Sequence, residues 1–356
     1  MQIDFHHAVT YAAVREAGFS HEDASRVAYA AQFVDDAANE HLVRFDGGEM
    51  YARIASAHKM VDYRNLRDLA NHRVWIPFHF LPGNDTGTSF AERLVCRPDS
   101  PVAREMVRSC IRDRNAEYGL MRLGVTLHVY ADTWAHQGFA GINHEVNDIG
   151  DITHSSRHTQ DWKAKMSHYF GTLFSRAAGH FVGDTLPLGH GAALCLPDLP
   201  YLEWTYVTHD GATVPRNNPS DFLHAADMLC RAARGFRLGG ENFEELDGLP
   251  EHRKVQILAN FRKFEEEDGD RRHRLWLTSL VDDFGYERAP SYATSGPRSW
   301  KSLALGRPAR ANADGIIYHF QPDFLASDWK LFHDALHAHR FHVLHHVLPA
   351  FGICAA

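Results

Sequence analysis

Long apolar runs, basic tracts and paired cysteines are all scarce in this sequence of 356 residues. No stretch approaches the roughly 18 uninterrupted apolar residues of a membrane-spanning helix, so we expect no membrane span. The opening residues MQIDFHHAVT lack the basic segment and the apolar run of a secretory signal. The five cysteines are scattered without a C-x-x-C pair, which argues against a disulfide scaffold and a cysteine-based zinc site. These absences predict a cytoplasmic protein.

Basic residues are outnumbered by acidic ones, with 37 Lys and Arg against 45 Asp and Glu, and the net charge is −8. Without a basic tract, we expect no strong binding to a nucleic-acid backbone. Hydrophobic residues make up 44% of the chain, enough for a well-buried core. The abundant residue is histidine, with 26 copies. Because His is the commonest metal ligand, a metal cluster is one explanation, and surface histidines on helices are the other.

Helical periodicity dominates the chain, and strand-like runs are few and short, so we predict an all-α fold. Ser20 should cap one helix, with Asp23 three residues later. Helices are expected over 5–17, 22–39, 48–72, 101–139, 160–186, 219–235, 250–267, 270–283 and 327–347, with irregular chain over 187–220 and 286–316. Residues 1–216 should form a helical metal-binding catalytic core, and residues 217–356 a C-terminal helical extension packed on it.

The clearest motif is H-x-x-x-D-x-x-x-H, formed by His128, Asp132 and His136. On a helix, each step of four residues drifts by about 40° and rises about 6 Å, so the three side chains share one face. The middle carboxylate has two oxygens and can bridge two metal ions. Imidazole with carboxylate suits zinc or non-haem iron. Apolar residues such as Val129 and Trp134 lie between the ligands, which predicts a buried helix whose polar side chains need partners.

Other histidines also have ligand-like spacing. The chain holds three further H-x-x-x-D pairs, and about two of the four in total are expected by chance at this composition. In the last predicted helix, His333/His337 and His342/His346 are pairs four residues apart that can chelate a metal, although a structural or surface role is the simpler interpretation. His154, His158 and His190 lie in predicted loops and are candidates for substrate contacts.

The His128–Asp132–His136 helix, preceded by an apolar run and followed by Phe139, resembles the zinc-dependent phospholipase C superfamily, which includes single-strand-specific nucleases. The resemblance covers about residues 1–200 and implies a multi-helix core that binds two or three zinc ions. The other matching pieces are an early His (His7 with Thr10, and His6 beside it), an Asp on the next helix (Asp35 or Asp36), a loop His (His79-Phe80) and a downstream pair. For that pair, His180 and Asp184 are preferred to His144 and Asp148, because only the former segment has a helical pattern.

The resemblance implies three ligand sets. The first ion would take Asp35 or Asp36 together with His79, His128 and Asp132, and the second would take His136, His180 and Asp184. A third would take His7 and the other oxygen of Asp132. Two features depart from the secreted members: their second His follows the Asp by six residues with a Pro between, and they use an N-terminal Trp amine as a ligand. This chain begins with Met1, and Asp4 or His6 could substitute for that amine.

The implied activity is a metal-dependent hydrolase that acts on a phosphoester, or another small-molecule substrate, through a di- or trinuclear zinc site. Catalytic roles would fall to Asp132 and to whichever of Asp35 and Asp36 binds no metal and can act as a general base. One alternative is a non-haem di-iron redox enzyme with the same ligands, and another is a non-enzymatic His-rich metal-binding protein. An HD-type phosphohydrolase would use His333-Asp334, but no later Asp completes that pattern.

Overall fold

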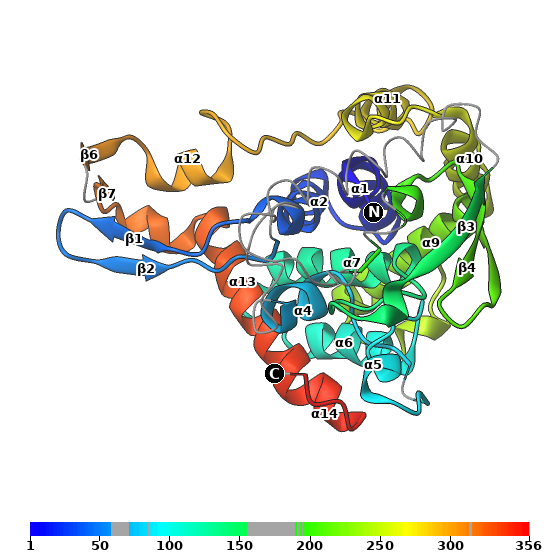
Figure 1. Cartoon of the computed structure of the whole chain (residues 1–356). Helices are drawn as coiled ribbons and strands as arrows, with labels where there is room; N and C mark the ends of the chain where they lie inside the picture. The colour runs from blue at the N-terminus through cyan, green and yellow to red at the C-terminus, as the bar shows by residue number, and fades with distance from the viewer. Residues whose placement is uncertain are drawn as a thin grey trace.

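The computed structural model describes residues 1–57, 71–84, 86–154, 189, 190, 193, 195–312 and 315–355. Long helices lie at the centre of the molecule, and small β-sheets lie toward its periphery (Figure 1). The helices are η1 Asp4–Val9, α1 Thr10–Glu16, α2 His21–Asp36, η3 Asn71–Trp75, α4 Ile76–Phe78, α5 Phe90–Arg93, α6 Pro101–Arg112, α7 Gly119–Ala135, η4 Glu145–Asn147, η7 Leu196–Asp198, α9 Asn218–Leu238, η8 Phe243–Glu245, α10 Glu251–Lys263, α11 Gly269–Asp282, α12 Trp300–Leu305, η9 Pro322–Ala326, α13 Asp328–His342, η10 Val343–Val347 and α14 Leu348–Ala350.

The strands are β1 Leu42–Phe45, β2 Met50–Ala52, β3 Ile149–His154, β4 Glu203–Thr208, β5 Thr213–Asn217, β6 Pro308–Asn312 and β7 Gly315–Tyr318. Within the described residues they form a four-stranded sheet in the order β2-β1-β7-β6 and a three-stranded sheet in the order β3-β4-β5. The prediction of an all-α protein is therefore wrong, and the fold is mixed α/β.

The first sheet contradicts two sequence predictions. Residues 50–52, expected in a helix, form β2, and the 286–316 segment, expected to be irregular, contains β6 and the start of β7. β1 pairs antiparallel with β2 and parallel with β7. The paired residues of β1 and β7 are more than 260 positions apart in the sequence. Strands of three to five residues offer too few positions for alternation to be recognised, and their stability comes from distant partners.

Two of the three strands of the second sheet, β4 and β5, lie in the 187–220 segment that composition suggested was irregular. Its β4–β5 hairpin runs antiparallel with Trp204 opposite Arg216 and Tyr206 opposite Val214. The turn contains Asp210-Gly211, and Gly211 has φ +85°, a conformation that glycine adopts without strain. The alternation of aromatic and β-branched residues in EWTYVT, followed by Asp-Gly, is a recognisable hairpin signal.

Helix α7 is the centre of the fold. All of its residues except Leu120 are buried, including the polar Arg122, His128 and Asp132 among a majority of apolar side chains. Helices α2, α6, α9 and α13 all contact it. The single helix predicted over 101–139 is wrong, because α6 and α7 are separated by residues 113–118, where Asp113 and Asn115 favour a turn.

Helix α2 packs closely on α7 because Gly124 leaves room for it. A Cβ added at Gly124 would lie 2.5 Å from the carbonyl oxygen of Val27 and 2.6 Å from Cβ of Ala30. Helix α2 begins where the sequence predicted, since the Ser20 hydroxyl accepts a hydrogen bond from the backbone N–H of Asp23 at 3.1 Å. The start and position of α2 thus bring its C-terminal end, with Asp35 and Asp36, toward the middle of α7.

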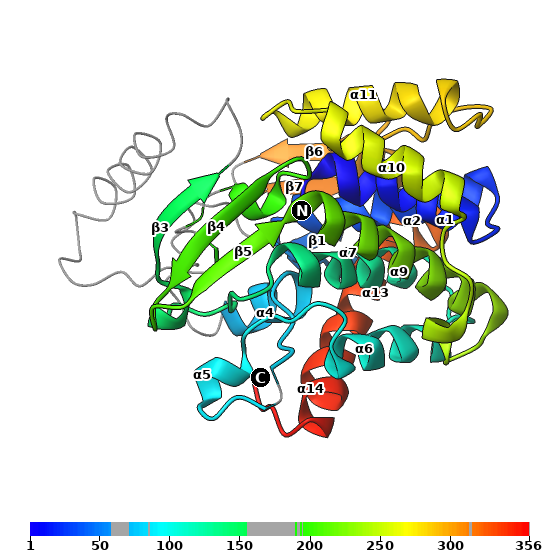
Figure 2. The same cartoon turned by 90° about the vertical axis from the view of Figure 1, so that its right-hand side faces the viewer.

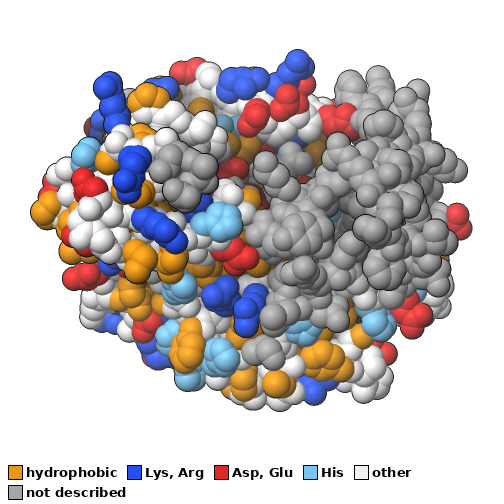
Figure 3. Space-filling view, turned by 60° about the vertical axis from the view of Figure 1, so that its left-hand side comes forward, with side chains coloured by type: hydrophobic (Ala, Val, Ile, Leu, Met, Phe, Trp, Pro, Cys, Tyr) orange, Lys and Arg blue, Asp and Glu red, His pale blue; other side chains and the backbone are white. Residues whose placement is uncertain are grey.

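The main hydrophobic core draws residues from the whole chain, including Phe5, Leu127, Phe222, Trp276 and Val347. Among the described residues, no helix is long and apolar enough to cross a membrane. On the coloured part of the face in Figure 3, Lys and Arg side chains are interspersed with acidic and hydrophobic ones. This part of the surface therefore shows no continuous basic stripe of the kind that follows a nucleic-acid backbone.

Candidate metal centre

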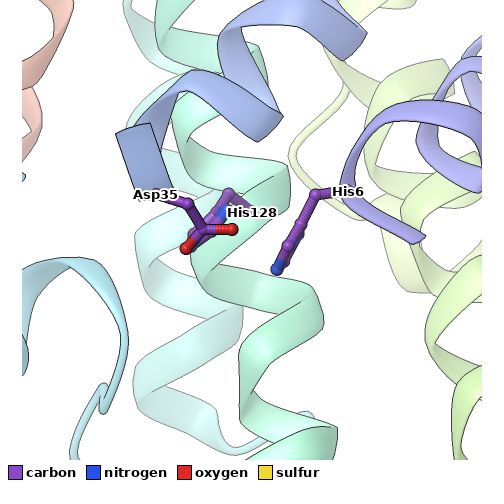
Figure 4. Close-up of side chains that lie close together, drawn as sticks. All are labelled: His6, Asp35 and His128. Atoms are coloured by element: carbon purple, nitrogen blue, oxygen red, sulfur yellow. The ribbon is translucent and has the colours of Figure 1, made fainter. Parts of the chain in front are cut away.

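Polar side chains from several elements meet against the buried face of α7. The helix contributes His128 and Asp132, and His136 directly follows its last residue; each of the three residues is at most 5% exposed. His6 comes from η1 and Asp35 from α2, and both point toward His128 (Figure 4). Five residues predicted as ligands are therefore brought together from three separate helices.

The first group consists of Asp35, His79, His128 and Asp132. Nδ1 of His79, Nε2 of His128 and Oδ2 of Asp132 lie 3.2–3.3 Å from one another. Oδ1 of Asp35 lies 3.8 Å from each of the two His nitrogens. Tetrahedral zinc with ligand bonds of about 2.0–2.1 Å would place neighbouring ligand atoms about 3.3–3.4 Å apart. His79, His128 and Asp132 therefore have the composition and the spacing of three zinc ligands, and Asp35 lies slightly farther away as a fourth candidate.

The tautomer of His79 supports this arrangement. Nε2 of His79 lies 2.9 Å from the carbonyl oxygen of Ser56, which only accepts, so Nε2 carries the hydrogen and donates it. In the neutral ring, Nδ1 then presents a lone pair to His128 and Asp132. A backbone carbonyl that orients a His in this way is a common outer contact of metal-ligating histidines.

The second group consists of His136, His190 and Asp198. Nε2 of His136 lies 3.5 Å from Oδ1 of Asp198, and Nε2 of His190 lies 3.5 Å from Oδ2 of the same carboxylate. Nδ1 of His136 donates to the carbonyl oxygen of His79 at 2.7 Å, which leaves Nε2 free to face Asp198. The ring of His190 lies beside that of His136, with centroids 4.8 Å apart.

Sequence analysis treated His190 only as a candidate substrate contact and missed Asp198. The two residues are eight positions apart and more than 50 positions from His136, so no helical spacing links the three. The Pro-rich segment LPDLP around Asp198 carries no ligand pattern. Only the β4–β5 sheet and the 195–202 turn, which carry this segment back to α7, bring the group together.

Oδ1 of Asp132 faces a third set of groups. Nε2 of His6 lies 3.2 Å from it, and the α-amino group of Met1 lies 2.8 Å from it and 3.0 Å from Oδ1 of Asp198. The His6 ring is stacked on that of His128, with centroids 3.8 Å apart. Asp132 thus faces the two His nitrogens of the first group with Oδ2 and faces His6 with Oδ1.

Several buried polar atoms of the cluster lack a hydrogen-bond partner. Among the described residues, Nδ1 of His6 and Nδ1 of His128 hydrogen bond to no other group. Nε2 of His6 and Oδ1 of Asp198 face charged neighbours, Asp132 Oδ1 at 3.2 Å and the Met1 amine at 3.0 Å, respectively. Buried polar groups without partners are costly, and a cation between them would satisfy the ligand atoms together. The residues present therefore fit a metal ion.

The electrostatics favour cations as well. Burial lowers the pKa of His6 and of His128 to about 4, so both rings are neutral at pH 7. Burial alone would raise the pKa of Asp132, but His136 and the Met1 ammonium hold it well below its usual range. Burial lowers and the neighbouring carboxylates raise the pKa of the Met1 ammonium, to about 11. Asp35, Asp132 and Asp198 thus face a single ammonium, and divalent ions would neutralise the remaining negative charge.

Some predicted ligands lie elsewhere. Nδ1 of His7 contacts Nε2 of His273 at 2.9 Å, and Asp36 accepts hydrogen bonds from Gln32 and Tyr292. Asp4 binds Arg272. Adjacent residues on a helix point about 100° apart, so only one residue of each pair, His6/His7 and Asp35/Asp36, can face α7.

The downstream pair is not placed by the structure. His180 and Asp184 lie outside the described residues, so their role stays a prediction. The alternative His144 accepts a hydrogen bond from the backbone N–H of Val146 and begins η4, and neither it nor Asp148 belongs to a metal-type group among the described residues.

Exposure differs across the cluster. The Asp35 side chain is 31% exposed, and those of His190 and Asp198 are 18% and 14% exposed, whereas His128 and Asp132 are buried. Desolvation still raises the pKa of Asp35, with Asp132 adding to the effect and the two histidines opposing it. Solvent therefore reaches the cluster at Asp35, His190 and Asp198.

The fold and the site together define a mixed α/β protein that holds a buried cluster of His and Asp side chains. Residues 1–347 match a family of unknown function, DUF6765, and the chain belongs to this family. No curated protein and no solved structure matched the chain. A functional proposal must therefore come from the geometry of the cluster.

Proposed function

We propose that this chain is a metal-dependent hydrolase of phosphoesters, with zinc ions held by the first and second groups. The observation that carries the proposal is the position of Asp132. Its Oδ2 faces His79 and His128, while its Oδ1 faces His6, in a cluster that also contains Asp35. A carboxylate shared in this way is suited to bridging two ions.

The neighbouring residues support more than one ion. The first group offers two His nitrogens and two carboxylates, and the second offers two His nitrogens and the Asp198 carboxylate. Closely spaced zinc ions activate water for attack on phosphorus and neutralise charge on the phosphate. The same ligand types and the α7 motif underlie the proposed similarity to the zinc-dependent phospholipase C superfamily.

The chain's own residues would perform three tasks. Asp132 holds two parts of the cluster in fixed relation, since it is buried and contacts both. Asp35, His190 and Asp198 supply the exposed rim at which a phosphoester would enter. Asp36 accepts hydrogen bonds from Tyr292 and Gln32 outside the cluster, so of the two predicted general bases only Asp35 reaches it. Asp35 can act as a base only where it does not bind the ion of the first group.

The test combines elemental analysis with a hydrolysis assay on bis(4-nitrophenyl) phosphate. Wild-type protein should contain two or three equivalents of zinc and hydrolyse the diester. Asp132→Ala should lose the zinc of the first group and any ion beside His6, because each of these ligand sets loses a carboxylate oxygen, and its hydrolysis should fall to background. Asp227→Ala is the matched control, since Asp227 is a buried helical Asp that binds Arg231 and Lys254 outside the cluster.

Other outcomes would decide between the alternatives. Zinc content that Asp132→Ala leaves unchanged would contradict the proposal. Tightly bound iron in place of zinc would keep the ligands but favour a redox enzyme, because His and Asp serve both metals. Many weakly bound, exchangeable ions would favour a metal-storage or metal-sensing protein.

A further inference from the structure

Arg272 of α11 makes a buried set of bonds to the N-terminal segment, residues 1–9. Its Nε donates to Oδ2 of Asp4 at 2.6 Å, and its Nη2 donates to Oε1 of Gln2 at 2.7 Å. Arg272 is completely buried and Asp4 is 1% exposed. Nη1 of the same guanidinium donates to the carbonyl oxygens of Glu266 and Glu267, which fixes its position in the fold. Because the buried guanidinium of Arg272 bonds to Asp4 through two nitrogens, it fixes both the distance and the orientation of the N-terminal segment relative to α11.

The next residue of α11 holds the same segment at a second point. Nε2 of His273 lies 2.9 Å from Nδ1 of His7, and the two rings meet edge to face. Gly269, at the start of α11, allows the approach, since a Cβ there would lie 2.4 Å from Oε1 of Gln2. Figure 2 shows α11 and α10 beside the N-terminal helices.

The residues held by α11 flank His6. Gln2 and Asp4 precede it and His7 follows it, while His6 itself points the other way, toward Asp132 and His128. Residues 4–9 form a π-helix, a geometry that is rare and often found at functional sites. The side of η1 that faces α11 is thus bonded to it. The opposite side presents the His6 ring, and neither ring nitrogen of His6 has a hydrogen-bond partner among the described residues.

We propose that Arg272 and His273 are positioning residues for an ion bound between His6 and Asp132. This inference rests on the proposed metal-dependent function. Helix α11 acts as a clamp that fixes the N-terminal segment against α7, so that His6 reaches Oδ1 of Asp132. His6 also lies within metal-binding distance of Asp35 and His128, but the shortest contacts of the first group join His79, His128 and Asp132, all outside the N-terminal segment. We therefore expect the ion of the first group to remain bound when the clamp is broken.

The experiment measures stepwise zinc release to a competing chelator, together with zinc content. Arg272→Met should bind one equivalent fewer than wild type, or bind it about 10- to 100-fold more weakly, as is typical when an orienting contact is lost. The remaining zinc should keep its wild-type affinity. Arg272→Lys should restore part of the lost affinity, because it keeps the charge opposite Asp4. Asp4→Asn provides a milder break of the same contact if Arg272→Met does not fold.

Arg253→Met is the matched control. Arg253 of α10 also bonds to an N-terminal helix, through Nε to Oε1 of Glu16 at 2.8 Å, and it binds the carbonyl oxygen of Phe284. It contacts no residue of the N-terminal segment, so its removal should loosen α1 without moving His6. Amide hydrogen exchange in the metal-free proteins should be faster at residues 4–9 in Arg272→Met and unchanged there in Arg253→Met.

Two failures can be told apart. A wild-type protein without tightly bound zinc would overturn the proposed function, and the clamp proposal with it. A wild-type protein with its full zinc content beside an Arg272→Met variant of equal content and affinity would overturn the clamp proposal alone. Equal zinc loss in Arg272→Met and Arg253→Met would also overturn it, because the effect would then reflect general loosening.

Discussion

The first and second groups share helix α7 but are assembled in different ways. Three ligands of the first group come from α2 and α7, whose packing is fixed by a continuous buried interface, and His79 directly follows α4. In the second group, His136 directly follows α7, His190 lies in a turn, and Asp198 is the last residue of the three-residue helix η7. Ligands on packed helices can be predicted from their spacing in the sequence. Ligands that lie between helices cannot, because their position depends on how the β4–β5 sheet directs the chain back to α7.

The largest expected effect separates the two groups directly. His128→Ala should weaken zinc binding by the first group more than about 100-fold, the upper range for losing only an outer contact. His190→Ala should weaken binding by the second group and leave the first unchanged. Competition with a chelator, followed by elemental analysis, measures both.

His144→Ala is the control for these variants, since His144 has the same residue type in a capping role. Loss of all zinc in His190→Ala would show that the two groups do not bind independently, and it would remove the distinction drawn between them.

The next effect is a pH dependence of the metal-free protein. Burial lowers the pKa of His6 and His128 from 6.5 to about 4. As pH falls below 6.5, the unfolded chain takes up protons that the folded rings cannot, so the free energy of unfolding should decrease between pH 6.5 and 4. The decrease should be about 3 kcal/mol for each fully buried ring. Chemical denaturation at a series of pH values measures it.

His128→Gln sharpens this prediction, because it removes one ring and leaves the other buried histidines with a lowered pKa, such as His333 and His339, in place. The decrease between pH 6.5 and 4 should be smaller in the variant by about 3 kcal/mol. A wild-type protein of constant stability over that range would contradict the burial of neutral rings in the cluster.

The smallest expected effect concerns the helix packing behind the first group. Gly124→Ala should destabilise the protein by about 2 kcal/mol, because the added Cβ would meet the backbone of α2. Helix propensity alone predicts the opposite sign, a gain of about 1 kcal/mol. Since α2 carries Asp35, zinc binding by the first group should weaken while the second group is spared. Thermal denaturation and chelator competition measure the two effects.

Gly240→Ala is the control, since a Cβ there would meet no atom within 4 Å. A more stable Gly124→Ala variant would show that α2 can move away from α7 at little cost, and that the first group tolerates the shift.

Much of the helical part of the fold could be predicted from local sequence. The Ser20 cap, the start of α2 and the α9, α10, α11 and α13 helices follow from capping residues and apolar periodicity. The sheets could not be predicted in the same way, except for the Asp210-Gly211 hairpin, whose turn signal was present. β1 and β7 are short and pair across most of the chain, so no local pattern records their partnership.

The sequence by itself determined that His128, Asp132 and His136 share one face of a buried helix, because the helical repeat places residues four apart in line. It also limited the other predicted ligands of the first group to His79 and to Asp35 or Asp36. Only the tertiary structure decided between Asp35 and Asp36 and between His6 and His7, since neighbours on a helix point in different directions and packing selects one. It also brought His190 and Asp198 to His136, because contacts between segments far apart in sequence depend on the folded chain and not on spacing.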